Sequence, residues 1–255
     1  MKKKRLFLVF ALISILFFIT QTLVYADVQV PSLELNLKET SGADGVVPAV
    51  KIITILTILS VAPAILLMMT SFTRILIVLS FVRQALGTQT MPPNQVILGL
   101  SLFLTMFTMA PVWDVIERDA VNPYLSKTIS QDTALEKLKT PVKNFMLNET
   151  RQDDLSLFYS LAKLDRPQQK EDVPLTILMP AFMISELKTA FQIGFLIYIP
   201  FLIIDMVISS ILMAMGMMML PPTVVSLPFK LVLFVLIDGW SLIVSSVMRS
   251  FQTFT

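Results

Sequence analysis

Four stretches of the sequence are almost free of charge, and they constrain the fold more than any other feature. They cover residues 46–69, 84–113, 189–229 and 231–248, and none carries more than one charged side chain. Each is long enough to cross a bilayer as a helix, which takes about 20 residues. Lipid offers no hydrogen bonds to the backbone, so such segments must be helical. With 55% hydrophobic and only 15% charged residues, the sequence predicts an all-α membrane protein.

The residue types that are missing exclude several classes of chemistry. The sequence has no cysteine and no histidine, which rules out thiolate nucleophiles, disulfides, zinc sites built on these ligands and serine–histidine triads. The net charge of +2 does not indicate a nucleic-acid-binding surface. No arranged nucleophile, base or metal ligand is evident, so we expect neither an enzyme nor a cofactor or metal site.

The first 26 residues read as a secretory signal peptide. A positive segment precedes an apolar core at residues 6–20, and Val24 and Ala26 supply the small residues expected before a cleavage site. We expect cleavage before Asp27, which would place the mature N-terminus outside the cytoplasm. The alternative is a first membrane helix that stays attached.

The remaining chain divides into four parts. A short polar lead at residues 27–45 precedes a first apolar helical hairpin at 46–115. A polar insert at 116–175 separates it from a second apolar hairpin at 176–255, which contains a methionine-rich turn. We therefore expect two long helical hairpins with a polar insert between them.

The insert has a nearly balanced charge and patterns that predict short helices at residues 130–139, 141–147 and 153–164. The third is amphipathic, because four apolar residues recur at helical spacing. They are Leu155, Phe158, Leu161 and Ala162. A disordered loop is the alternative.

Charge also predicts orientation. The link between the first two apolar stretches, residues 70–83, contains Arg74 and Arg83 and no acid, so the positive-inside tendency places it in the cytoplasm. The insert and both mature termini would then be periplasmic, and the methionine-rich turn would face the cytoplasm. Prolines inside the apolar segments, such as Pro111 and Pro200, predict kinks or breaks.

Five methionines fall within seven residues, where the third apolar stretch turns. They are Met213, Met215, Met217, Met218 and Met219. Methionine is flexible and polarizable and packs against irregular shapes, so a cluster at a turn suggests a soft seal. Gly216 would allow a tight turn, and Pro221 and Pro222 would stiffen the start of the next helix. The alternative is that these methionines fill gaps in a core.

Ionisable groups within apolar segments are costly and are usually paired or functional. Ser185, Lys188 and Gln192 share one helical face, whereas Glu186 points about 160° away from Lys188. Glu186 and Lys188 should therefore find partners on other helices or other subunits, unless both extend to an interface.

Two carboxylates lie deeper in apolar stretches. Asp205 is close to Pro200, and Asp238 is too far from Lys230 for a contact within one helix. The two acids could form a proton relay, or they could hold helices together. No histidine or second close acid supports a relay, so we favour packing and assembly.

Two long runs, residues 180–195 and 227–240, resemble the signatures of the FliP family, the flagellar biosynthetic proteins and their counterparts in type III secretion injectisomes. Shorter runs at 68–74, 83–88 and 215–219 are similar to other blocks of that family. The resemblance covers about residues 46–250. A signal peptide is more typical of the flagellar branch.

The resemblance implies a function. Family members assemble in several copies, for which we expect a pentamer, with FliQ, FliR and other export-apparatus proteins. They form the export gate of the flagellar basal body in the bacterial inner membrane, and unfolded flagellar subunits pass through it. Their helical hairpins wrap into a tapering pore that lies largely above the bilayer.

In such a pore, Met215, Met217, Met218 and Met219 would form a gasket around the channel. Seven charged residues would hold neighbouring subunits together: Arg74, Arg83, Glu186, Lys188, Asp205, Lys230 and Asp238. The rival interpretation is a secondary transporter or ion channel of the inner membrane, because broken helices and buried acids are common to both.

Overall fold

The computed structural model describes residues 43–251, apart from positions 89, 168, 170–171 and 218. The expected signal peptide and all but the last residues of the polar lead lie outside this part. The chain forms two compact units, Met1–Thr57 and Ile58–Thr255. Helix α2 (Ala43–Met68) begins in the first unit, and all the contacts below lie within the second.

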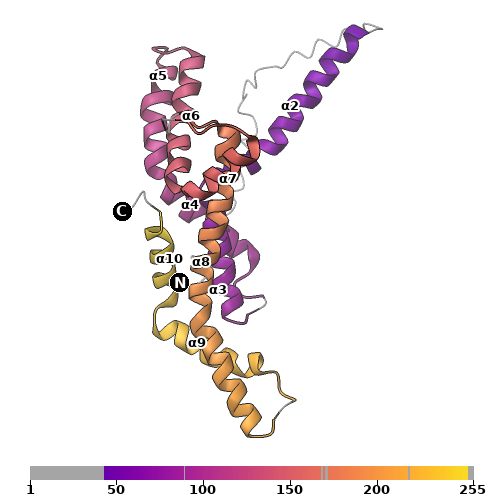
Figure 1. Ribbon diagram of the computed structural model, residues 1–255, viewed down its shortest axis with the longest axis vertical. Helices are drawn as coiled ribbons and strands as arrows, with labels where there is room; N and C mark the ends of the chain where they lie inside the picture. Colours follow the sequence, from indigo (N-terminus) through magenta and orange to yellow (C-terminus); the bar gives the residue numbers. More distant parts are fainter. Residues whose placement is uncertain (1–42, 89, 168, 170–171, 218, 252–255) are drawn as a thin grey trace, which may run out of the picture. The chain divides into compact units, whose positions relative to one another are not determined.

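The described residues form helices and connections, with no β-strand among them, which confirms the all-α prediction (Figure 1). After α2, the elements in chain order are α3 (Phe72–Ala85), α4 (Asn94–Ile116), the π-helical segment η2 (Glu117–Val121), α5 (Asn122–Leu125), α6 (Gln131–Glu149), α7 (Gln152–Ala162), α8 (Leu175–Ala214), α9 (Pro222–Leu236) and α10 (Gly239–Arg249).

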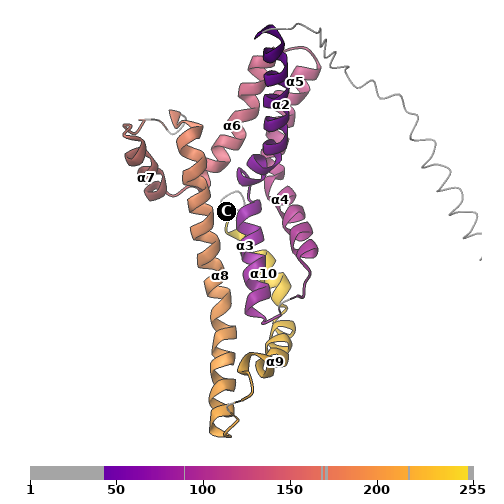
Figure 2. The same cartoon turned by 90° about the vertical axis from the view of Figure 1, so that its right-hand side faces the viewer.

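The core forms where α3 packs along α8 (Figures 1 and 2). Helix α3 buries an apolar stripe at i, i+3, i+4 and i+7, the pattern that turns one helical face toward a neighbour. The stripe is Ile75, Val78, Leu79 and Val82. Residues 70–83, which we expected to be a link between two spans, therefore belong mainly to a core helix. Its apolar stripe packs into the core although Arg74 and Arg83 led us to place these residues in a cytoplasmic link.

Two described helical stretches are long and apolar enough to cross a membrane, Asn94–Leu125 and Leu175–Ala214. A third span results if α9 and α10, which meet at a bend of 67°, are counted as one. Among the described residues, two or three of the four expected spans therefore qualify by length and composition. The apolar part of the first expected span, Ile52–Ile65, is too short to qualify.

Helix α8 runs for 40 residues without a break, although it contains Pro180 and Pro200. Helix α4 likewise continues through Pro111 and begins directly after Pro93, its N-cap. Proline removes one backbone hydrogen bond and strains the preceding turn. Here this does not interrupt the helices, so of the predicted kinks or breaks no break occurs at Pro111 or Pro200.

The polar insert is helical in its described part. The two short helices expected before residue 150 are one helix, α6, which passes through Pro141. Helix α7 matches the third, and part of the predicted face turns inward, because Leu155 and Phe158 pack partly buried against the core. Asp154 and Tyr159 are buried, whereas Leu161 is 67% exposed. The polar contacts of Asp154 with α8 decide which face of α7 turns inward.

Candidate functional site: a methionine turn and three ion-pair clusters

Helix α8 ends in the methionine-rich turn, at the end away from α7 (Figure 2). The backbone N–H of Met217 donates to the carbonyl of Leu212 at 2.9 Å, and the N–H of Gly216 donates to the carbonyl of Met213 at 3.0 Å. These two bonds make a Schellman motif, which needs a left-handed residue at the position that Gly216 occupies. Gly216 has φ +73°, a backbone conformation that is open to glycine because it lacks a Cβ.

The methionines of this turn point away from the chain's own core. Met213 and Met215 are each 59% exposed, Met217 is 41% exposed and Met219 is 97% exposed. Met218 lies outside the described residues. Pro221 is the N-cap of α9 and Pro222 its first residue. The alternative that the four described methionines fill a core of the single chain is therefore wrong.

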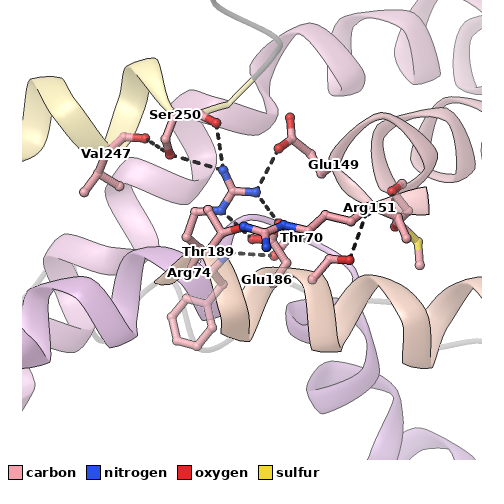
Figure 3. Close-up of polar contacts among 12 residues, drawn as sticks. Thr70, Arg74, Glu149, Arg151, Glu186, Thr189, Val247 and Ser250 are labelled. Atoms are coloured by element: carbon pink, nitrogen blue, oxygen red, sulfur yellow. Dashed lines mark hydrogen bonds and ion pairs between the residues drawn. The ribbon is translucent and has the colours of Figure 1, made fainter. Parts of the chain in front are cut away.

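The second feature is a buried cluster around Arg74 of α3 (Figure 3). Its Nε donates to Oε2 of Glu186 at 2.9 Å, and one terminal nitrogen donates to both Oε1 of Glu186 and Oε2 of Glu149, the latter at 2.8 Å. The other terminal nitrogen donates to the carbonyl and the hydroxyl of Ser250, at 2.9 and 3.1 Å. The ring of Phe251 covers the guanidinium face at 4.0 Å.

All five N–H donors of Arg74 are therefore used, and the cation is buried. Arginine suits such a site because its planar fork donates in fixed directions and binds carboxylates in pairs. The cluster unites α3, the end of α6, α8 and the residues after α10. The sequence alone pointed to Arg74 and Glu186 but not to Glu149, Ser250 and Phe251. No local pattern marks these three, because only the fold brings them to Arg74.

The third feature attaches α7 to α8. Asp154 is buried and accepts hydrogen bonds from Lys188 and, at 2.8 Å, from the hydroxyl of Ser185. The N–H of Arg151 donates to the same hydroxyl at 3.0 Å. Burial raises the pKa of Asp154, but the hydrogen bonds from Lys188 and Ser185 and the charges of Lys188 and Arg151 outweigh it and hold the pKa below its ordinary value. Sequence reasoning missed Asp154 and Arg151, which lie more than 30 residues from their partners.

The fourth feature is an ion pair that joins α8 to α9. Its two residues lie on either side of the methionine-rich turn in the sequence. Nζ of Lys230 donates to Oδ2 of Asp205 at 2.6 Å, and the hydroxyl of Ser226 donates to the other carboxylate oxygen. Lys230 is buried, whereas Asp205 is partly exposed. Asp205 thus joins two helices of the same chain.

The other predicted charges lie at the surface of the chain. Arg83 is partly exposed and donates to the side chain of Asn94. Asp238 is exposed and has left-handed backbone, with φ 49°, at the bend between α9 and α10. Lys188 contacts Asp154 but leaves half of its side chain exposed. The structure therefore does not bring Arg83, Asp238 and Lys188 together with the Arg74 cluster.

The described residues contain no group of three or more carboxylates, histidines or cysteines that could hold a metal ion. What they contain instead is a set of ion pairs that fix helices to one another, and a wide apolar outer surface. The exposed apolar residues include Phe103, Met106 and Phe107 on α4, and Phe195 and Leu196 on α8. Together with the apolar helices long enough for a bilayer, this surface defines an all-α membrane protein.

Comparison with known proteins agrees with the family resemblance. The FliP family model matches residues 55–247, which is most of the chain. The chain belongs to the FliP family. It is 58% identical over 217 residues to the flagellar biosynthetic protein FliP of Bacillus subtilis, an alignment that covers 85% of this chain and 98% of the relative.

Two further relatives carry the same name. The protein of Pectobacterium carotovorum is 56% identical, with 80% of each chain covered. That of Aquifex aeolicus is 50% identical, with 88% of this chain and 93% of the relative covered. The similarity therefore extends over most of the length of all three relatives.

Proposed function

We propose that this protein is a pore subunit of the flagellar type III protein export gate in the bacterial inner membrane. Several copies, for which we expect five, assemble with FliQ and FliR around a conduit for unfolded flagellar subunits. The methionine turns of these copies form the seal. The observation that carries the proposal is the exposed methionine turn at the end of α8, in a chain of the FliP family.

The chemistry of the turn suits a protein conduit. An export channel has to pass chains of any sequence and block ions when it is empty. Thioether side chains are flexible and make contacts of low specificity, so a ring of them closes on itself and yields to any passing segment. The Schellman motif fixes the backbone and leaves the side chains of Met217 and Met219 exposed.

The outer surface supports assembly. Monomeric soluble proteins rarely expose large contiguous apolar patches, and here α4 and α8 expose several phenylalanines and leucines. In an assembly these side chains pack against other subunits or lipid. Of the seven charged residues, we assign Arg83, Lys188 and Asp238 to contacts with neighbouring subunits, because each is at the surface. Arg74, Glu186, Asp205 and Lys230 support assembly by fixing the subunit's own helices.

The seal is tested by replacing Met217, Met218 and Met219 with alanine and measuring ion leak across the inner membrane. We expect an increased leak while the complex still forms. A matched control replaces Met68 and Met91, which are also exposed but lie outside the turn and outside α4 and α8, and we expect no leak from it. If the first variant exports normally and its membrane stays impermeable to ions, the methionine turn is not the seal.

A secondary transporter predicts a different result. Deletion of the gene should abolish flagella and motility if the protein belongs to the export gate. Loss of solute uptake in membrane vesicles, with motility intact, would instead favour transport. The pairing of Asp205 with Lys230 and Ser226 gives that acid a structural partner, which supports a packing role over a proton relay.

A further inference from the structure

The last described residues of the chain contact the start of α3. Ser250 and Phe251 follow α10, and both engage Arg74 in the first turn of α3, 176 residues earlier for Ser250. Two of the five hydrogen bonds of Arg74 and the cover over its guanidinium face come from these two residues. Phe251 is fully buried there. The bonds to Ser250 use one terminal nitrogen of Arg74, and the ion pairs with Glu186 and Glu149 use the other terminal nitrogen and Nε.

The other end of α10 is a corner. Helices α9 and α10 meet at 67°, and the left-handed backbone of Asp238 makes the bend. Phe234 and Trp240 pack edge to face across it, with ring centroids 5.3 Å apart. This corner keeps the helices joined but leaves the far end of α10 to be fixed by other contacts.

Between these two ends an apolar groove of about 370 Å³ separates α10 from α8. Its lining includes Ile193, Ile197, Phe201, Leu242 and Ser246. Tightly packed helices interdigitate without spaces of this size. On α10 only Gly239, Ile243 and Val247 are buried, and the hydroxyl of Thr108 on α4 donates to the sulfur of Met248 at 3.5 Å. Ser250 and Phe251 add the contacts with Arg74 at the end of this helix.

We propose that Arg74, Ser250 and Phe251 form a latch that holds α10 closed against the rest of the subunit. While the latch is engaged, α10 forms one wall of the groove, opposite α8. When Ser250 and Phe251 leave Arg74, α10 turns about the corner at Asp238 and the groove opens. Arg74 keeps its pairs with Glu186 and Glu149 in both states, so the charge stays paired and the rest of the subunit stays folded.

The latch is tested by distance measurements between spin labels on the full chain in detergent. The sequence has no cysteine, so Gln84→Cys on α3 and Arg249→Cys at the end of α10 give one unique pair, both at exposed positions. The comparison is between the native C-terminus, a chain ending at Phe251, a chain ending at Arg249 and the Phe251→Ala variant. A second pair, Gln84→Cys with Thr176→Cys on α8, reports whether α3 and α8 remain packed.

We expect one narrow distance for the native chain and for the chain ending at Phe251. Both the chain ending at Arg249 and the Phe251→Ala variant should gain a second, longer and broader population, while the α3–α8 distance stays the same. An unchanged narrow distance in the chain ending at Arg249 overturns the latch. A broadened α3–α8 distance overturns it as well, because the contact would then support the whole core instead of α10 alone.

Discussion

Gly194 of α8 lies directly against the ring of Phe81 on α3. A methyl group at position 194 would stand 2.6 Å from Cδ2 and 3.1 Å from Cβ of that phenylalanine, so the ring would have to move. Phe81 also packs edge to face on Phe191, with ring centroids 5.4 Å apart. The absence of a side chain at Gly194 therefore sets how closely the two core helices approach.

Gly194→Ala should lower the thermal unfolding midpoint of the purified protein in detergent. Overpacking of this kind costs about 1–3 kcal/mol, which exceeds or matches the gain of about 1 kcal/mol from alanine's helix propensity. Gly99→Ala in α4 is the matched control, because a methyl there would meet nothing within 4 Å. We expect that variant to be unchanged or more stable. Equal midpoints for the two variants would contradict this account of the α3–α8 contact.

Lys230→Met should destabilise the α8–α9 pair, since it leaves the carboxylate of Asp205 with Ser226 alone. Removing one partner of a buried ion pair costs roughly 3–5 kcal/mol, and the partial exposure of Asp205 places the loss at or below the lower end of that range. The double variant Lys230→Met with Asp205→Leu should recover part of it, because no unpaired charge remains. Unfolding midpoints measure both. A double variant that is no more stable than Lys230→Met would argue against the ion pair as the cause.

Arg74→Lys keeps the positive charge but should still lower the stability of the protein. Lysine has three donors on one atom and cannot reproduce five donors in a planar fork, so Glu149, Glu186 or Ser250 loses its contact with residue 74. Buried charges without partners are strongly destabilising. Arg83→Lys is the matched control on the same helix, because Arg83 is partly exposed and hydrogen-bonds to Asn94. We expect a lower protein yield and unfolding midpoint for Arg74→Lys only. Equal effects at both positions would contradict the role of the fork.

The contact of Asp154 with Lys188 and Ser185 should weaken at low pH. Its native pKa lies below the ordinary value, which is about 3.9 for an aspartate, so the carboxylate's contribution to stability is fully present above that pH. It is lost as the pH falls through the lowered native pKa. Asp154→Asn should therefore be less stable than the native protein at pH 7, and the difference should shrink in acid. A difference that is the same at neutral pH and in acid below the native pKa would show that charge is not the cause.

The methionine turn illustrates what local sequence predicts well. Five methionines, Gly216 and Pro222 lie within ten residues, and each acts through its own backbone or its nearest neighbours. The glycine takes the left-handed position and the proline begins the next helix. The same holds for the helical state of the apolar stretches, because lipid or a protein interior forces any long apolar segment to satisfy its own backbone.

The pairing of charges could not be predicted in the same way. The sequence indicates that Glu186 and Lys188 point apart on α8, but Arg74, the partner of Glu186, lies 112 residues away, and Asp154, the partner of Lys188, lies 34 residues away. Which face of α7 is buried depends on the second of these pairs. The arginines of residues 70–83 favour a cytoplasmic link, yet Arg74 is buried in the core and paired with Glu149 and Glu186.

The sequence by itself determined that this protein is helical, that it belongs to a membrane environment and where its methionine turn lies, because these follow from the hydropathy and conformational preferences of neighbouring residues. The tertiary structure decided that α3 is the centre of the core, that Gly194 sets its distance from α8, and that Ser250 and Phe251 close on Arg74. Those relationships depend on which distant segments meet. The two residues of an ion pair or a steric contact are far apart in the sequence, and only the packing of the helices brings them together.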